Sequence, residues 1–290
     1  MKENSRLAPF FVMSAGICWG IIGLFTRHLS ALGFSSVQIT CGRCFISAVV
    51  MILFIAVTQP RNFRIHVRDL WMFLGLGLFS IAFFNVCYFT AIQLTTLSMA
   101  AILLYTAPSI VVVLSVILLK EAFTPVKAVC LIFAFAGCVL VSGLGLEKVN
   151  MPGVLAGLGA GLGYAMYSVF GRYALTKYSP VTVTAWTFII GFLGLIGFSR
   201  PLEFAIMAIS IPSAFFWFFM LGTVITVLPY GLYTIGLNRM EAGKASIFAS
   251  VEPLASTVMG VAVFHEPLTW TNLSGIICIL LAVIVLNRRG

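Results

Sequence analysis

The stretch Lys244–Pro267, KASIFASVEPLASTVMGVAVFHEP, is an apolar run long enough to cross a bilayer, and it carries Glu252 and Pro253 near its middle. An ionised carboxylate at mid-bilayer costs about 2.5 to 3.5 kcal/mol or more. Such a group is retained where a cavity solvates it, so Glu252 is a candidate functional residue. The alternative is a carboxyl group that is protonated or paired for structural reasons. We therefore expect the rest of the chain to supply a cavity around Glu252.

The composition of the 290-residue chain excludes a soluble domain. Hydrophobic residues make up 61% and charged residues 9%, which leaves too little polar surface to cover a globule. Apolar runs of about 20 residues favour membrane helices over the alternating segments of about ten residues that build a membrane β-barrel. The net charge of +9 does not indicate a nucleic-acid partner here, because the basic residues sit mainly in short loops. We expect an all-α integral membrane protein surrounded by the lipid bilayer.

Ten membrane-spanning helices are predicted, each bounded by charge or by Pro and Gly. They cover about residues 8–27, 37–58, 70–92, 96–119, 125–143, 152–174, 181–199, 212–236, 243–264 and 269–287. Ten spans place both termini on one side, together with Lys2, Arg6, Arg61, Arg64, Arg68, Lys120, Lys127, Arg172, Lys177, Arg239, Lys244, Arg288 and Arg289. Arg27, Lys148 and Arg200 fall on the other side. The excess of basic residues predicts cytoplasmic termini, with the N-terminal segment retained as the first span.

An internal repeat emerges when the chain is compared with itself at an offset of 145 residues. The aligned pairs include Tyr88 with Tyr233, Pro108 with Pro253, Glu121 with Glu266, Trp19 with Tyr164, and Arg27 with Arg172. Each unit has five spans, an odd number, so the second unit must enter the membrane upside down relative to the first. We expect two inverted five-helix repeats, residues 1–145 and 146–290, that form one unit around a central cavity. Secondary transporters of this kind bind their substrate near mid-membrane, between the repeats.

Several motifs along the chain together resemble the drug/metabolite transporter superfamily, specifically its EamA-type members. They are CWG at Cys18–Gly20, Arg43 early in the second span, TAPSI…LLKE at Thr106–Glu121, and VEPLAS…FHEPLT at Val251–Thr269. The resemblance implies a ten-helix carrier in which the first four helices of each half enclose a cavity, while the fifth and tenth lie at the periphery. It also implies transport of small metabolites, often amino acids and their derivatives, commonly outward and commonly coupled to protons.

Two charged residues, Glu252 and Arg43, lie well inside the predicted spans. We expect both to face one cavity. There Glu252 carries a proton or meets a substrate amine, while Arg43 meets a carboxylate or pairs with Glu252. The alternative for Arg43 is a side chain that snorkels to the headgroups, because it lies within reach of the interface.

Pro108 and Pro253 occupy equivalent places in the fourth and ninth spans. A proline inside a helix removes one backbone hydrogen bond and exposes a carbonyl, which neighbours or cavity water satisfy in a membrane. The two kinks are expected to serve gating between the halves, or to be structural only. Glu121 and Glu266 close the same spans. We expect a structural role for both, in which the carboxylate satisfies free amides at a nearby helix start.

Several aromatic residues fall in the interior of spans rather than at the interfaces, where Trp and Tyr usually gather. The best candidates for lining the cavity are Trp19, Tyr88, Tyr164 and Tyr233. Such rings suit an aromatic or amphipathic substrate, or they enclose a quaternary ammonium through cation–π contacts of about 1 to 2 kcal/mol. Ordinary core packing is the alternative. Asn85, one turn before Tyr88, is expected to be a polar cavity residue.

The sequence predicts neither a cofactor nor a metal site. No zinc spacing or P-loop occurs, and GLGAGLG at residues 157–163 lies inside an apolar span, which favours close helix packing over nucleotide binding. The sequence contains no nucleophile paired with a base of the kind that would indicate an enzyme.

The predicted function is a secondary carrier in the plasma (inner) membrane of a prokaryote. It exports amino acids or related small metabolites by alternating access, and proton coupling is left open. One alternative is proton-coupled uptake of a cationic compound such as choline. Another is a membrane receptor or assembly subunit without transport. We expect a monomer, with a dimer as the alternative.

Overall fold

The computed structural model of this chain describes residues 7–142, 150–265 and 267–289, so Lys2, Arg6, Lys148 and Glu266 lie outside the described residues. Every regular element in these ranges is helical. Within the described ranges, nine helical stretches are long and apolar enough to cross a membrane, or ten if the bent pair Pro180–Ile196 and Pro201–Ser210 counts as one span. The predicted all-helical membrane class is therefore confirmed over the described residues.

The first half of the chain contains five candidate spans. Their elements are α1 (Ala8–Gly20) with α2 (Ile22–Ala31); α3 (Ser36–Thr58); α4 (Leu70–Leu74) with the π-helical η4 (Gly75–Phe83) and α5 (Phe84–Leu94); α6 (Leu97–Leu104) with α7 (Ala107–Leu119); and α8 (Pro125–Ser142). Two short 3-10 helices, η2 (Pro60–Phe63) and η3 (Val67–Asp69), connect α3 to α4.

The second half follows the same order. Its elements are α9 (Met151–Ala174); α10 (Pro180–Ile196) with α11 (Pro201–Ser210); α12 (Pro212–Gly222) with the π-helical η5 (Thr223–Val227) and α13 (Leu228–Leu237); α14 (Ala242–Ala249) with α15 (Glu252–Phe264); and α16 (Trp270–Arg289). The π-helical segments η4 and η5 overlap when they are compared at the repeat offset of 145 residues.

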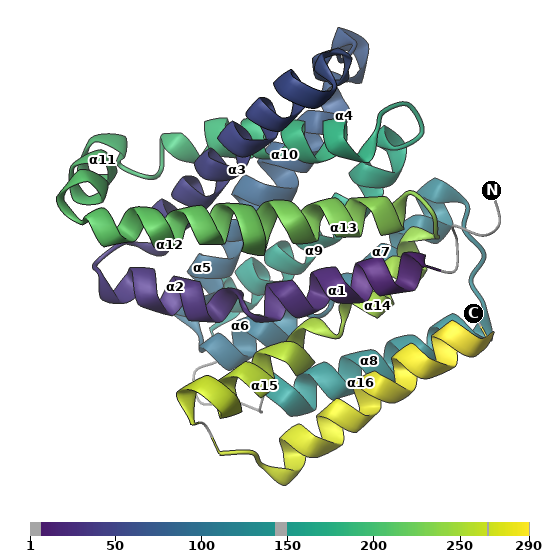
Figure 1. The fold of residues 1–290 in the computed structure, drawn as a ribbon. Helices are drawn as coiled ribbons and strands as arrows, with labels where there is room; N and C mark the ends of the chain where they lie inside the picture. The colour runs from purple at the N-terminus through teal and green to yellow at the C-terminus, as the bar shows by residue number, and fades with distance from the viewer. Residues whose placement is uncertain (1–6, 143–149, 266, 290) are drawn as a thin grey trace.

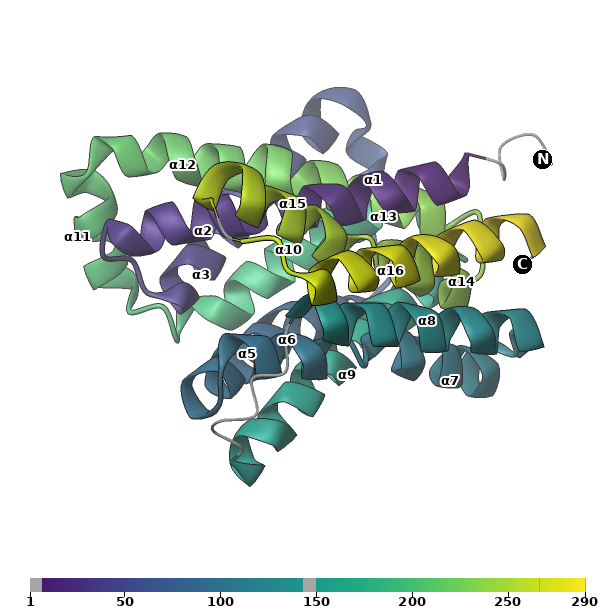
Figure 2. The ribbon, with the colours of Figure 1, turned by 90° about the horizontal axis from the view of Figure 1, so that it is seen from below.

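Figure 1 shows that α1 begins and α16 ends at the same end of the bundle, and Figure 2 shows the same from below. We call this the terminal end. The opposite end, where α2 and α15 finish, we call the far end. Large apolar side chains such as Phe54, Ile132 and Phe215 are exposed on the outside of the bundle. Such an exterior suits lipid, because acyl chains solvate apolar side chains and backbone groups are satisfied within helices.

The contacts between the two halves occur in corresponding pairs. Helix α5 packs along α9, and α13 packs along α1 in the corresponding way. Helices α8 and α16, the fifth and last spans, pack on each other along their length. Gly137 of α8 and Gly275 of α16 cross so closely that a Cβ atom on either would lie 2.7 Å from the carbonyl oxygen of the other. Small residues permit this close backbone approach between helices.

The predicted seventh span, 181–199, needs a correction at its end. Helix α10 stops at Ile196, and the segment expected to be a loop contains α11, which bends away from α10 by 106°. Arg200 takes a left-handed conformation with φ of 49°, and Pro201 then begins α11 at a position where its fixed φ suits a helix start. Helix α11 lies at the far end of the bundle (Figure 1). Hydropathy alone did not reveal it, because its 10 residues are too few to cross a bilayer.

Candidate functional site

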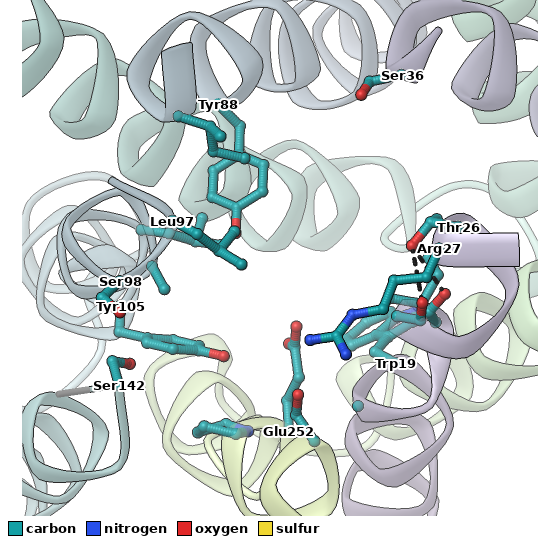
Figure 3. Close-up of a pocket in the computed structure, with 18 of the residues that line it drawn as sticks. Trp19, Thr26, Arg27, Ser36, Tyr88, Leu97, Ser98, Tyr105, Ser142 and Glu252 are labelled. Atoms are coloured by element: carbon teal, nitrogen blue, oxygen red, sulfur yellow. Dashed lines mark hydrogen bonds between the residues drawn. The ribbon is translucent and has the colours of Figure 1, made fainter. Parts of the chain in front are cut away.

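A cavity of about 750 Å³ lies between the two halves. Its walls come from α1, α2, α3, α5, α6 and α8 of the first half and from α9, α13, α15 and α16 of the second. The lining residues Ser36, Ser142 and Asn272 belong to the ends of helices that meet at the far end, so the cavity opens there. Figure 3 shows Glu252 projecting into this space, with the Tyr88 and Tyr105 hydroxyls and the Arg27 guanidinium turned toward the same space.

Glu252 is the first residue of α15, immediately after the break that separates α14 from α15. Its position places the carboxylate beside the positive end of a half-helix, where free backbone amides favour a negative charge. Glu252 Oε2 accepts a hydrogen bond of 3.1 Å from the Tyr164 hydroxyl. Within the described part of the chain, no Lys or Arg nitrogen lies within 4 Å of this carboxylate. A negative charge on Glu252 is therefore available to a cationic group in the cavity.

Arg43 lies on α3 and also lines the cavity. Its side chain is only 7% exposed, and among the described residues its Nε has no hydrogen-bond partner. This burial does not fit a side chain that reaches the headgroups. The structure also shows no ion pair between Arg43 and Glu252. Both charges thus belong to one cavity without neutralising each other, and the direct pairing that the sequence suggested is not formed.

Aromatic rings form the floor of the cavity. The Trp19 ring lies 6.3 Å from Tyr164 and 5.1 Å from Tyr230, and all three residues line the cavity. Tyr88 and Tyr105 line it as well. Tyr233 does not. Its ring packs 5.3 Å behind Trp19.

The remaining polar candidate, Asn85, is 5% exposed and lies in the cavity wall. Its side chain donates to the Ile81 carbonyl at 2.8 Å and accepts from the Thr40 hydroxyl at 3.3 Å. Asn85 therefore joins α5 to α3. The role of these residues in binding stays a prediction.

Pro108 and Pro253 stand directly after breaks in their spans. Helix α6 ends at Leu104 and α7 begins at Ala107, while α14 ends at Ala249 and α15 begins at Glu252. The prolines occupy the first turn of the new helix, where their missing N–H costs nothing. These breaks make the discontinuous helices that often frame a transporter site. Whether the kinks serve gating stays a prediction.

Glu121 reaches the other half of the molecule. Its carboxylate accepts hydrogen bonds from the backbone amides of Ala242 at 2.6 Å and Gly243 at 3.1 Å, at the start of α14. It therefore satisfies free amides at a helix start, and that start belongs to the ninth span. Glu266, its counterpart at the repeat offset, lies outside the described residues.

The terminal end of the cavity is closed by polar contacts. Lys127 Nζ, on a side chain that is 2% exposed, contacts Glu241 Oε2 at 2.7 Å and donates to the Ala122 carbonyl at 2.7 Å. Burial raises the pKa of Glu241, but the hydrogen bond and charge of Lys127, with Lys244 3.6 Å away, outweigh burial and lower the pKa below its ordinary value. Sequence reasoning missed this ion pair, because its members lie in separate halves and read as ordinary loop charges.

Arg172 and two tyrosines complete the closure at the terminal end. Arg172 Nη1 donates to the carbonyl of Leu237 at 3.0 Å. The Tyr233 hydroxyl shares a hydrogen bond of 2.7 Å with Ser168, and Tyr173 donates to the Leu118 carbonyl at 2.9 Å. Helix α9 is thereby joined to α13 and to α7 at this end.

Sequence reasoning also missed residues that line the cavity near its opening, among them Arg27, Gln93 and Asn272. Arg27 was assigned only to the loop charges. The signal that distinguishes it is its alignment with Arg172 in the repeat, because a basic residue retained in both halves indicates an equivalent contact.

No group of three or more His, Cys, Asp or Glu that could hold a metal occurs in the described ranges. A helical membrane protein with a partly polar cavity between two similar halves is typical of the class of membrane transporters. Comparison with known proteins agrees with this class. The sequence profile of the EamA-like transporter family matches residues 6–143 and again residues 151–288. The chain belongs to the EamA-like transporter family.

Individual relatives extend over nearly the whole chain. A protein of Archaeoglobus fulgidus named "Uncharacterized transporter" is 30% identical over 285 residues, which cover 98% of this chain and 97% of the relative. Another from the same organism is 26% identical over 279 residues, covering 94% and 95%. The Bacillus subtilis protein "Uncharacterized transporter YetK" is 23% identical and covers 84% and 76%. A solved crystal structure matches with a TM-score of 0.76 at 18% identity, over 98% of this chain and 96% of that one, which is a likeness of fold.

Proposed function

We propose that the protein is a secondary carrier that exports amino acids or their derivatives across the plasma membrane of a prokaryote by alternating access. The observation that carries the proposal is the single cavity in which Glu252 and Arg43 both lie without pairing with each other. A zwitterion satisfies both charges at once. Its ammonium group meets Glu252, and its carboxylate meets Arg43. Burying either charge alone is costly, so the complementary ligand gains from both contacts.

The aromatic floor adds a preference for the substrate side chain. Trp19, Tyr164 and Tyr230 present ring faces and edges at the bottom of the cavity. Aromatic pairs contribute about 0.5 to 1.5 kcal/mol beyond the area that they bury. We expect bulky apolar or aromatic amino acids to be transported better than small polar ones.

The two halves of the carrier are proposed to be inverted repeats. Two observations support this arrangement. The family profile matches the chain twice at an offset of 145 residues, and the packing of α5 on α9 recurs as that of α13 on α1. With five spans per repeat, the second half enters the membrane in the opposite direction. Under the expected cytoplasmic location of the termini, the far end and its open cavity face outward.

A second candidate function is proton-coupled uptake of a quaternary ammonium compound such as choline. The aromatic rings around an unpaired Glu252 favour it, because such rings attract cations. The buried Arg43 opposes it, because a cation gains nothing from a second positive charge in the same cavity. Export of a zwitterion explains both charged residues and is therefore preferred.

The test is transport in proteoliposomes that hold the purified protein. Radiolabelled phenylalanine or leucine, the corresponding amino-acid amides, and choline are offered in parallel, with a pH-sensitive dye to report proton movement. We expect transport of the amino acids and weak transport of the amides, which lack the carboxylate. Transport of choline alone would transfer the assignment to the uptake alternative.

Variants connect the transport to the cavity. Glu252→Gln and Arg43→Gln are each expected to lower transport by about 10- to 100-fold, the effect of losing one charged hydrogen bond. Glu203→Gln is the matched control, because Glu203 pairs with Arg200 on the exposed surface of α11, outside the cavity. Equal transport by all three variants would contradict the proposed site. Proton movement that is absent in Glu252→Gln, yet present in the control, would assign the coupling to Glu252.

A further inference from the structure

The closed terminal end shows how one arginine holds two helices together. Arg172 Nη1, near the end of α9, donates to the carbonyls of Leu237 at 3.0 Å and Asn238 at 3.4 Å. These carbonyls belong to the last turn of α13, where a helix has no N–H partners of its own. A guanidinium there satisfies them and interacts with the negative end of the helix. Arg172 therefore fastens α9 to α13 across the closed end.

The residues that correspond to these groups lie at the far end, where the cavity is open. At the repeat offset of 145 residues, Arg172 corresponds to Arg27, and Leu237 and Asn238 correspond to Ile92 and Gln93. All three counterparts line the cavity. The Arg27 guanidinium currently lies over the Phe264 ring, 4.2 Å from its centre. Figure 3 shows it extending into the cavity from α2.

A second contact of the closed end likewise has counterparts that line the cavity at the far end. At the closed end, the Ser168 hydroxyl bonds to Tyr233 at 2.7 Å. Their counterparts are Gly23 and Tyr88, which both line the cavity. A Cβ atom added to Gly23 would meet nothing within 4 Å, so this surface of α2 is open. The helix faces that are packed together in the second half are therefore separated by the cavity in the first.

The break at Ile21 permits α2 to move while α1 stays in place. Helix α1 is fixed against α15, because a Cβ atom on Gly20 would lie 2.5 Å from the carbonyl oxygen of Glu252. Helix α2 begins after the break and packs instead on α3 and α12, where Phe25 contacts Trp217 with ring centres 5.7 Å apart. A pivot at Ile21 would carry α2 together with these helices.

We propose that Arg27 is the latch of the far end. When the cavity closes there, α2 moves toward α5, and Arg27 leaves Phe264 to donate hydrogen bonds to the carbonyls of Ile92 and Gln93. Arg172 releases its own carbonyls at the other end in the same transition. This inference rests on the proposed transport function and names the gate that controls access to its site.

The experiment follows access to the cavity from the far end. Ser256, one helical turn after Glu252 on α15, lines the cavity, and Ser256→Cys gives a thiol for a membrane-impermeant maleimide added outside intact cells. No native cysteine lines the cavity, so the parent protein without Ser256→Cys serves as the blank. The labelling rate reports the fraction of time for which the far end is open.

Arg172→Ala removes the latch of the terminal end and is expected to lower the labelling rate. Adding Arg27→Ala removes the opposing latch and is expected to restore the rate toward that of the parent. We expect each change to be about tenfold, at the lower end of what one lost charged hydrogen bond gives in a two-state equilibrium, because Arg172 is half-buried and Arg27 is exposed. Arg27→Lys keeps the charge but lacks the planar guanidinium that can donate to two carbonyls at once. This variant is expected to restore the rate only in part.

The inference would be overturned if the double variant labelled as slowly as Arg172→Ala alone. Phe264→Leu distinguishes the other explanation, in which Arg27 only holds the open state through its contact with Phe264. If that were so, Arg27→Ala and Phe264→Leu would lower the rate alike.

The labelling needs no knowledge of the substrate. A restored rate in a protein that transports no amino acid would refute the proposed function and keep the gate, whereas normal transport without restoration would refute the gate.

Discussion

At the scale of single residues, the cavity holds Glu252 and Arg43, neither of which forms an ion pair with another described residue. Glu252 receives one hydrogen bond, from Tyr164, and the buried Arg43 has a nitrogen without a partner in the described chain. Unsatisfied buried groups are costly, so a protein retains them where a ligand completes them. Tyr164 is the residue that fixes the position of the Glu252 carboxylate.

Tyr164→Phe removes that hydrogen bond and keeps the ring. We expect the KM for a transported amino acid to rise by about 10- to 100-fold, in line with about 1.5 to 3 kcal/mol for a hydrogen bond to a charged group. Tyr88→Phe is the matched control, because Tyr88 lines the same cavity and makes no hydrogen bond to Glu252 in the structure. Concentration-dependent uptake into proteoliposomes measures both. An equal effect of the two changes would show that Tyr164 does not position Glu252.

The Lys127–Glu241 pair predicts a pH dependence of stability. The pKa of Glu241 is lowered in the folded protein, so the pair stabilises the fold fully above the ordinary carboxyl pKa and loses this effect as pH falls through the lowered value. Glu241→Gln is expected to cost about 1 to 3 kcal/mol at pH 7, because it leaves the buried Lys127 without its partner, while partial exposure of Glu241 weakens the effect.

Thermal unfolding of the purified protein at pH 7 and pH 4 tests this prediction. We expect the difference in Tm between the parent and Glu241→Gln to be large at pH 7 and to shrink at pH 4. The double variant Lys127→Met with Glu241→Gln should regain part of the lost stability, because no buried charge remains. A constant difference at both pH values would show that the pair does not titrate with folding.

At the scale of elements, broken helices shape the site. The breaks before α7 and α15 end one half-helix and begin another within the span, which places the start of α15 and its carboxylate at the cavity. The continuous helices α8 and α16 pack on each other along their length and reach the cavity wall at their far ends, through Ser142 and Asn272. The broken helices supply Glu252, while this continuous pair supports the fold.

Gly275→Leu is expected to separate α8 from α16. A Cβ atom at Gly275 already falls 2.7 Å from the Gly137 carbonyl oxygen, so the larger side chain forces the backbones apart at a cost of about 2 to 3 kcal/mol. Gly231→Ala is the control. Its added Cβ meets nothing within 4 Å, and alanine favours a helix interior by about 1 kcal/mol. Thermal unfolding in detergent should show a lower Tm for the first variant only; an unchanged Tm would contradict the tight crossing.

At the scale of the whole molecule, the cavity is open at one end and closed at the other. The closed end carries the Lys127–Glu241 pair and the Arg172 contacts, and α1 begins and α16 ends there. The two ends are thus chemically different although the halves correspond. Lys127 and Glu241 align with Asn272 and Thr96 at the repeat offset, so the far end lacks the counterpart of the buried ion pair. We expect this difference to favour the state that is open at the far end.

The orientation in the membrane is directly testable. A cysteine at Gln93, in the cavity wall at the far end, should react with an impermeant maleimide outside intact cells, whereas one at Thr176, beyond the end of α9 at the terminal end, should react only after permeabilisation. This result follows from the excess of Lys and Arg on the terminal side. The reverse pattern of labelling would place the termini outside.

Much of the fold was predictable from the sequence, because hydropathy and helix breakers are local properties. The span positions, the breaks beside Pro108 and Pro253, and the offset of 145 residues that the two family matches share were all visible in the residues. The mid-span position of Glu252 marked the cavity. Contacts across the halves were not predictable. Glu121 caps α14 rather than a helix of its own half, and Tyr233 lies behind the cavity floor, because helix rotation and neighbour choice follow from packing.

The sequence by itself determined that this chain is helical, that it lies in a membrane, and that an acidic residue stands where a helix must break. The reason is energetic: an apolar run long enough to cross the bilayer satisfies its backbone as a helix, and a charge within it requires a solvated site. The tertiary structure alone decided which end of the cavity is open and which side chains face it. Those properties depend on how the helices of the two halves pack against each other, and no single stretch of sequence determines that packing.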